Sequence, residues 1–124
     1  MAVSDAQECF RVSWDDEAQV VRTAWFPGAV CRLQEAKAVT DEIRDLDRGS
    51  VPVLVDMRDM AKLERSAREH FATDSGGVRA IALLAASPVT RMMANFFIGM
   101  RRMPVPIKMF TDEPEAVAWL QSQT

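Results

Sequence analysis

The hydrophobic pattern of the first 28 residues predicts a β-hairpin. Residues 10–14 alternate apolar and polar side chains, and this period of two is typical of a strand. Residues 18–26 are rich in β-branched and aromatic side chains, which predicts a second strand. The acidic segment 15–19 suits the turn between them, and a Pro-Gly pair at 27–28 ends the hairpin.

Residues 33–48 predict an amphipathic helix. Apolar side chains recur there every three or four residues, and charged side chains occupy the other side. We expect Gly49 to end this helix as a C-terminal cap, because glycine adopts the left-handed conformation without strain.

Two later segments predict buried strands, each followed by a helix. Residues 51–57 and 79–85 are short apolar runs without alternation, as in strands that are covered on both faces of a parallel sheet. Residues 63–73 predict the first following helix, and residues 88–102 predict the second. Ser87 is the expected N-cap of the second helix, because the next residue is a proline that suits the first helical position.

The C-terminal segment predicts one more strand and one more helix. We place the strand at residues 105–110 and at a sheet edge, because Pro106 cannot donate a ladder hydrogen bond. The last helix follows Asp112, which is expected to form a capping pair with Glu115.

The elements together predict one α/β domain over residues 1–124. An N-terminal β-hairpin is followed by a helix and three strand–helix units. Right-handed crossovers place the last three strands parallel, in a mixed sheet covered by helices.

The helix expected at 88–102 is unusually apolar. At about 100° per residue, seven apolar side chains fall within an arc of roughly 140°, which we expect to face the core. Ile98 falls on the opposite side, and Phe97 lies at the rim of the arc. The side of Ile98 also carries Arg91, Asn95 and Arg102. These five residues are our candidate surface for a protein partner or a second copy of the chain. The predicted core arc consists of Val89, Met92, Met93, Phe96, Phe97, Met100 and Met103.

Composition excludes several classes of function. A net charge of -3 gives no reason to expect a nucleic-acid partner, which requires a basic face. The N-terminus is short, polar and acidic, unlike a signal peptide, and the apolar stretch 80–86 is too short to span a membrane. We therefore expect a cytoplasmic protein without a membrane span.

Cysteines and histidine suggest no catalytic or metal site. Cys9 and Cys31 lack metal-ligand spacing and are expected to be free thiols in a reducing compartment. His70 is the single histidine, and no nucleophile–base pair can be named. Motifs for phosphate, dinucleotide or zinc binding are missing too. We expect a protein that is not an enzyme and that has no cofactor and no metal.

Four segments carry a resemblance to a known superfamily: VPVLVDMRD, SPVTRMMANFF, PVPIKMF and EPEAVAWL. With the order of elements from about Phe10 onward, the chain resembles the STAS/SpoIIAA-like superfamily, and especially small uncharacterised bacterial proteins described as STAS/SEC14-like. The resemblance implies a compact α/β domain that generally lacks enzymatic activity. Relatives act as anti-sigma factor antagonists, or bind nucleotides, hydrophobic ligands or partner proteins.

The resemblance also suggests a phosphoacceptor. The antagonists carry a regulatory serine in an Asp-Ser-Ser-Gly turn, at the start of the helix after a central strand. The matching segment here is LERSAR, in which Ser66 takes the place of the phosphorylated second serine. Glu64, Arg65 and Ala67 replace the other three residues. The alternative is that Ser66 is a surface residue of a first helical turn.

The ends of the predicted parallel strands form a candidate ligand crevice. Ligands of open α/β sheets bind outside the carboxyl ends of such strands. Asp56, Arg58 and Asp59 follow the first strand, Ser87 the second and Thr111 the third. Ser87 and Thr111 would stand near helix N-termini, which can hold anions. The alternative is that they cap those helices.

Three functional hypotheses follow from the sequence. The first is a non-catalytic binding or regulatory module that contacts a protein partner or forms a homodimer. The second is an antagonist switched by phosphorylation of Ser66. The third is a carrier of a small hydrophobic ligand between helices and sheet, because flexible methionines of the helix at 88–102 could line an adaptable pocket.

Overall fold

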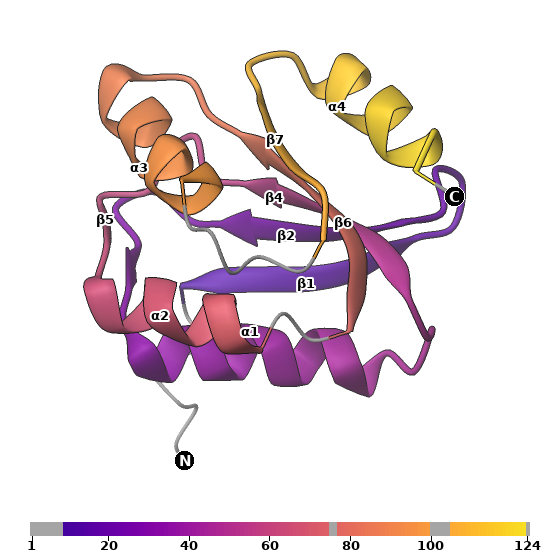
Figure 1. The fold of residues 1–124 in the computed structure, drawn as a ribbon, viewed down its shortest axis with the longest axis horizontal. Helices are drawn as coiled ribbons and strands as arrows, with labels where there is room; N and C mark the ends of the chain where they lie inside the picture. The colour runs from indigo at the N-terminus through magenta and orange to yellow at the C-terminus, as the bar shows by residue number, and fades with distance from the viewer. Residues whose placement is uncertain (1–8, 75–76, 100–104, 124) are drawn as a thin grey trace.

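A computed structural model of the chain describes residues 9–74, 77–99 and 105–123 (Figure 1). Within these ranges seven strands and four helices alternate as a mixed α/β fold. In chain order they are β1 (Phe10–Asp15), β2 (Val20–Trp25), β3 (Val30–Cys31), α1 (Leu33–Asp45), β4 (Val51–Asp56), β5 (Lys62–Leu63), α2 (Arg65–Thr73), β6 (Val78–Leu84), α3 (Pro88–Ile98), β7 (Ile107–Phe110) and α4 (Glu113–Gln121).

The main sheet has five strands in the order β1-β2-β4-β6-β7. β1 and β2 form the predicted antiparallel hairpin, and every other pair in this sheet is parallel. β7 lies at the edge, as Pro106 predicted. The fold class is therefore confirmed: a hairpin, a helix and three strand–helix units build a mostly parallel sheet flanked by helices.

Side chains of the sheet alternate between two hydrophobic cores. Along β2, Val21 and Trp25 belong to the core beneath α1 and α2, whereas Val20 belongs to the core beneath α4. Figure 1 shows α1 and α2 together on one side of the sheet and α4 on the other. Because successive strand residues point to opposite faces, Thr23 faces α1 and α2, and Arg22 faces α4.

A small second sheet was not predicted. β3 and β5 pair in parallel over two residues each, which is too short for a hydrophobic period to show. This pairing delays the start of α2 to Arg65, two residues after the predicted start.

The first helix, α1, ends earlier than predicted, with Leu46 as its C-cap. Asp47, directly after this cap, has a left-handed φ of 52°, whereas Gly49, which is also left-handed with a φ of 70°, lies beyond the end of the helix.

The predicted caps of the last two helices are confirmed. The Ser87 hydroxyl accepts the Thr90 N–H at 3.1 Å, at the start of α3. An Asp112 carboxylate oxygen accepts the Glu115 N–H at 3.1 Å, at the start of α4. These bonds satisfy backbone donors that a helix leaves free in its first turn.

The predicted core arc of α3 is wrong. Val89, Met92 and Phe96 are 49%, 55% and 53% exposed, although Met93 is buried as expected. The helix therefore turns much of its apolar stripe to solvent. Three further members of the predicted arc lie outside the described residues or side chains: Phe97, Met100 and Met103.

A polar residue decides which face of α3 is buried. Thr90 is 1% exposed, and its hydroxyl accepts the N–H groups of Ala86 and Ser87, each at 3.0 Å. Ala94, one turn further on, is fully buried. Thr90 and Ala94 are small enough to bring the helix close to its neighbours, so the buried face is rotated by roughly a quarter turn from the apolar stripe.

Candidate functional site

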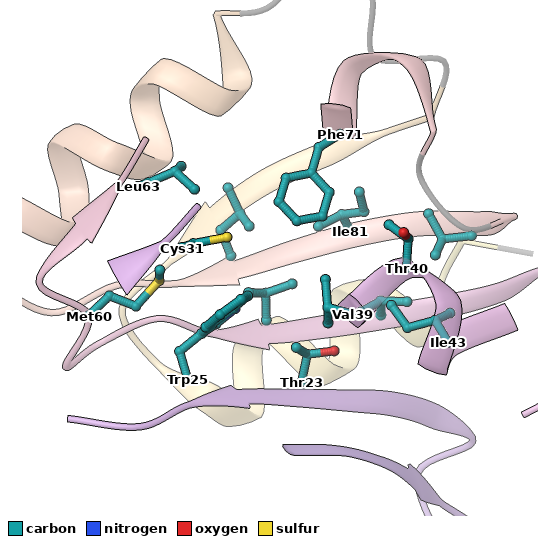
Figure 2. A pocket seen from close by; sticks show the side chains of 14 residues that line it. Thr23, Trp25, Cys31, Val39, Thr40, Ile43, Met60, Leu63, Phe71 and Ile81 are labelled. Atoms are coloured by element: carbon teal, nitrogen blue, oxygen red, sulfur yellow. The ribbon is translucent and has the colours of Figure 1, made fainter. Parts of the chain in front are cut away.

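A cavity of about 60 Å³ lies between the main sheet and helices α1 and α2 (Figure 2). Its walls are almost entirely apolar. They consist of Thr23, Trp25, Cys31, Val39, Thr40, Ile43, Val53, Val55, Met60, Leu63, Phe71, Val78, Ile81 and Leu83. None of these residues belongs to the described part of α3, so Met92 and Met93 do not line this cavity.

The two threonines of the cavity differ in their hydrogen bonds. The Thr40 hydroxyl lies 3.0 Å from the Lys37 carbonyl oxygen and 3.1 Å from His70 Nε2. This hydroxyl therefore links α1 to α2, and its hydrogen-bonding capacity is satisfied. The Thr23 hydroxyl is buried and has no hydrogen-bond partner among the described residues.

The cysteine in the cavity wall behaves as an apolar group. Cys31 is fully buried, and burial raises the pKa of its thiol well above the ordinary range. Cys9 is half-buried, and the two cysteines form no disulfide. A thiol that stays protonated is a weak nucleophile, so Cys31 contributes packing rather than reactivity.

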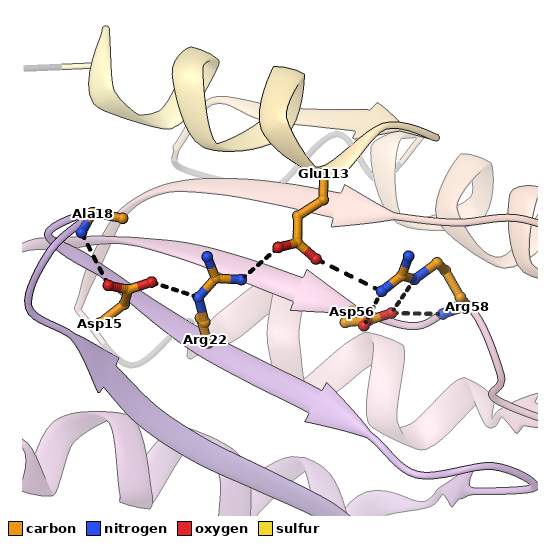
Figure 3. Close-up of polar contacts among 6 residues, drawn as sticks. All are labelled: Asp15, Ala18, Arg22, Asp56, Arg58 and Glu113. Atoms are coloured by element: carbon orange, nitrogen blue, oxygen red, sulfur yellow. Dashed lines mark hydrogen bonds and ion pairs between the residues drawn. The ribbon is translucent and has the colours of Figure 1, made fainter.

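A chain of ion pairs crosses the opposite face of the sheet, beneath α4 (Figure 3). Arg22 Nε donates to Asp15 at 2.7 Å, and Arg22 Nη1 donates to Glu113 at 3.1 Å. Glu113 also lies 3.7 Å from Arg58 Nη2, which donates to Asp56 at 2.8 Å. Two arginines thus bridge three carboxylates and tie the first turn of α4 to β2 and to the end of β4.

The surroundings of Asp15 and Asp56 lower the pKa of both carboxyl groups. Burial acts to raise the pKa of Asp56, but hydrogen bonds from Arg58 outweigh it, and the pKa is lowered. The pKa of Asp15 is lowered by a hydrogen bond from the Ala18 N–H and by Arg22. Neither carboxylate is set up as a general acid, which would require a raised pKa.

The structure brings together only part of the predicted strand-end crevice. Asp56 and Arg58 form a bidentate pair, and Asp59 is exposed. The Ser87 hydroxyl is engaged with Thr90, in the capping role that was the alternative, and Thr111 is exposed.

Sequence reasoning missed Arg22 and Glu113 as members of this cluster. They lie 91 positions apart and meet only because β2 and α4 are neighbours in the fold. A charged residue inside a predicted strand was the one available signal, and it did not identify the partner.

An apolar surface covers the outer side of α3. We call Val89, Met92 and Phe96 the α3 apolar face. A groove of about 230 Å³ separates it from β5 and α2, where Leu63 and Arg68 complete the wall. The Arg68 guanidinium lies over the Phe96 ring, 4.9 Å from its centroid. A second, shallower hollow of about 400 Å³ runs past Met92 and Phe96 on the other side of the helix.

Basic side chains border the α3 apolar face. Lys62 and Arg68 lie on one side and Arg91 on the other. Lys62 is 4.0 Å from Glu64, whereas Arg68 and Arg91 form no ion pair within the described residues. The surface thus combines methionine, aromatic and arginine side chains, the types that are enriched at protein interfaces.

The predicted partner surface overlaps this region in part. Arg91 and Asn95 are exposed and line the second hollow. Ile98 is 39% exposed but borders the buried face at Ala94, so it is not the centre of an exposed patch. The Phe97 side chain and Arg102 lie outside what the structure describes. Sequence reasoning missed the three residues of the α3 apolar face because it assigned them to the core.

Ser66 occupies the second position of α2 and is half-buried. Its place in a first helical turn agrees with both sequence interpretations. Phosphorylation of Ser66 stays a prediction.

The described residues form neither a metal-binding cluster nor a membrane-spanning helix. No group of three or more potential metal ligands comes together there. None of the helices in these ranges combines the length and the apolar character that crossing a bilayer requires.

The fold has a counterpart among solved structures. The chain is similar to the crystal structure of an uncharacterised protein of the DUF3478 family, with a SpoIIAA-like fold, from Shewanella loihica PV-4. The TM-score is 0.59 at 13% identity, and the match covers 90% of this chain and 91% of that chain. This likeness shows a SpoIIAA-like fold. No curated protein matches the chain.

The sequence also matches a family model over residues 14–124, nearly the whole chain. That model is described as a domain of unknown function, DUF7793. The protein therefore belongs to the DUF7793 family.

Proposed function

We propose that this protein is a non-catalytic, cytoplasmic binding module that uses the α3 apolar face to contact a partner protein. The observation that carries the proposal is the exposure of Val89, Met92 and Phe96 on one side of a single helix. Burying three such side chains in a complex would supply favourable hydrophobic free energy. Monomeric proteins seldom leave a contiguous patch of this kind without a use for it.

The charge around the face favours an acidic partner. Lys62, Arg68 and Arg91 surround the apolar side chains, and two of them lack a carboxylate partner among the described residues. A partner helix with an apolar stripe and acidic borders would satisfy both features at once. A second copy of this chain would place the same arginines opposite each other in a two-fold interface, which like-charge repulsion disfavours.

Titration with two synthetic helical peptides tests the proposal. Both peptides carry the same leucine stripe, and their polar positions are glutamate in one and lysine in the other. We expect the glutamate peptide to shift the amide resonances of α3 and α2 in ¹⁵N-labelled protein, and the lysine peptide to bind at least roughly tenfold more weakly. Equal binding of the two peptides, or no binding of either, would contradict the proposed charge preference.

A matched pair of variants locates the contact. Phe96→Ala should weaken binding of the glutamate peptide by roughly tenfold or more, because it removes a large aromatic contact at the centre of the face. Phe26→Ala removes an exposed phenylalanine that lines a separate hollow with Cys9 and Pro27, and it should leave the affinity unchanged. Equal losses in both variants would place the contact elsewhere.

A further inference from the structure

The cavity beneath α1 and α2 contains a polar group that packing does not explain. Thr23 is 2% exposed, and its hydroxyl has no hydrogen-bond partner among the described residues. Figure 2 shows this side chain on β2, among the hydrophobic side chains that surround the cavity. A buried hydroxyl without a partner costs free energy, and valine would have the same shape without that cost. The hydroxyl is therefore a candidate for binding something that enters the cavity.

The other polar groups of the cavity are already satisfied. The Thr40 hydroxyl is bonded within α1 and to His70, and the Cys31 thiol is directed to the Arg32 carbonyl oxygen at 3.8 Å. The remaining wall is hydrocarbon and aromatic ring. A bound water needs two to four polar partners, and the described walls offer one free hydroxyl. A molecule with one polar group and an apolar body matches the wall better than water does.

The volume limits the size of that molecule. About 60 Å³ is several times the roughly 10–15 Å³ that one water requires, and it is well below the roughly 150 Å³ cavity that binds benzene. We propose that the cavity binds a short aliphatic molecule of two or three carbons with one hydroxyl or carbonyl oxygen, which hydrogen-bonds to the hydroxyl of Thr23. Such a site lies on a different part of the molecule from the α3 apolar face and does not depend on its function.

Two isosteric probes test the site. Ethanol and propane are small enough for this volume, have the same shape, and differ by a hydroxyl in place of a methyl group. Methyl NMR of the full chain measures the affinity of each probe from shifts at Val53, Val39 and Leu83. In the wild type both probes should shift these methyls. Substituting Thr23→Val should lower the preference for the alcohol over the hydrocarbon by roughly threefold to tenfold, because one hydrogen bond is lost. The site is refuted if neither probe shifts these resonances, or if the preference is the same in wild type and variant.

Control variants separate the hydroxyl from the shape of the cavity. Thr23→Ser keeps the hydroxyl and should keep the preference for the alcohol. Val39→Ile adds a methyl group to the cavity wall and should lower the affinity for both probes to a similar extent.

Thermal unfolding tests whether the Thr23 hydroxyl is unpaired, without any added probe. Thr23→Val should unfold at the same temperature as the wild type or at a higher one, because an unpaired buried hydroxyl has been removed. A clearly lower midpoint would show that the Thr23 hydroxyl already has a partner, and it would overturn the proposal.

Discussion

Glu35 is a carboxylate with no exposed surface, at the start of α1. One of its oxygens accepts the Arg32 N–H at 2.9 Å and Arg32 Nε at 3.0 Å. The other oxygen accepts Arg32 Nη2 at 3.0 Å and the Gln34 amide at 2.9 Å. An arginine side chain has no acceptor, so only half of a capping box forms, with Glu35 reaching back to the backbone. Burial acts to raise the pKa of Glu35, but the hydrogen bonds from Arg32 and Gln34 outweigh it and the pKa is lowered.

Replacement of this carboxylate should have a pH-dependent effect on stability. Because the folded-state pKa lies below the unfolded one, the carboxylate stabilises the fold above about pH 4.3, and this contribution is lost as the pH falls through the folded-state pKa. Glu35→Gln should lower the free energy of unfolding by about 1–2 kcal/mol at pH 7. Urea unfolding of both proteins should show a smaller difference at pH 3. An equal difference at the two pH values would show that the charge is not responsible.

At the scale of elements, α3 shows how a polar residue can override an apolar stripe. Helical periodicity alone placed Val89, Met92 and Phe96 in the core, and the structure exposes them. Thr90 and Ala94 face inward instead, because the Thr90 hydroxyl accepts two backbone N–H groups of the β6–α3 connection. The orientation of this helix is thus set by hydrogen bonds at its first turn, and the apolar residues that remain outside form the proposed contact surface.

Loss of the Thr90 hydroxyl should destabilise the fold. Thr90→Val would leave the N–H groups of Ala86 and Ser87 without their acceptor, at a cost of about 1–3 kcal/mol in the free energy of unfolding. Thr90→Ser keeps the hydroxyl and should cost clearly less, so chemical denaturation of the two variants separates the hydroxyl from packing. If the valine variant is as stable as the wild type, these hydrogen bonds do not determine how α3 is seated.

At the scale of the whole molecule, charge is distributed unevenly. The chain has a net charge of -3, yet Lys62, Arg68 and Arg91 gather around the α3 apolar face. The ion pairs beneath α4 place two of the other arginines, Arg22 and Arg58, between carboxylates. The α3 side therefore presents uncompensated positive charge among the residues described, although the protein as a whole is acidic.

This distribution should keep the protein monomeric at low salt. Light scattering after size exclusion should give a mass near 13.9 kDa for the wild type at low ionic strength. Removing the repulsion with Arg68→Gln and Arg91→Gln together, or screening it with about 0.5 M salt, should raise the measured mass with protein concentration. A wild-type mass of twice 13.9 kDa at low salt would instead make a second copy of the chain the partner of this surface.

The sequence by itself determined the order and type of the long elements. Alternation revealed the hairpin, continuous apolar runs revealed β4 and β6, and a proline placed β7 at the edge. These features depend on local periodicity and on backbone chemistry that each residue carries with it. The pairing of β3 with β5 was not predicted, because a strand of two residues is too short to show a hydrophobic period.

Only the tertiary structure decided where side chains from distant segments meet. It paired Arg22 with Glu113, left the Thr23 hydroxyl without a partner among the described residues, and turned the apolar stripe of α3 toward solvent. Each of these outcomes depends on which elements are neighbours and how they are turned against one another. A hydrophobic pattern shows that one side of a helix is apolar. Whether that side is buried or exposed depends on contacts with residues that are distant in the sequence.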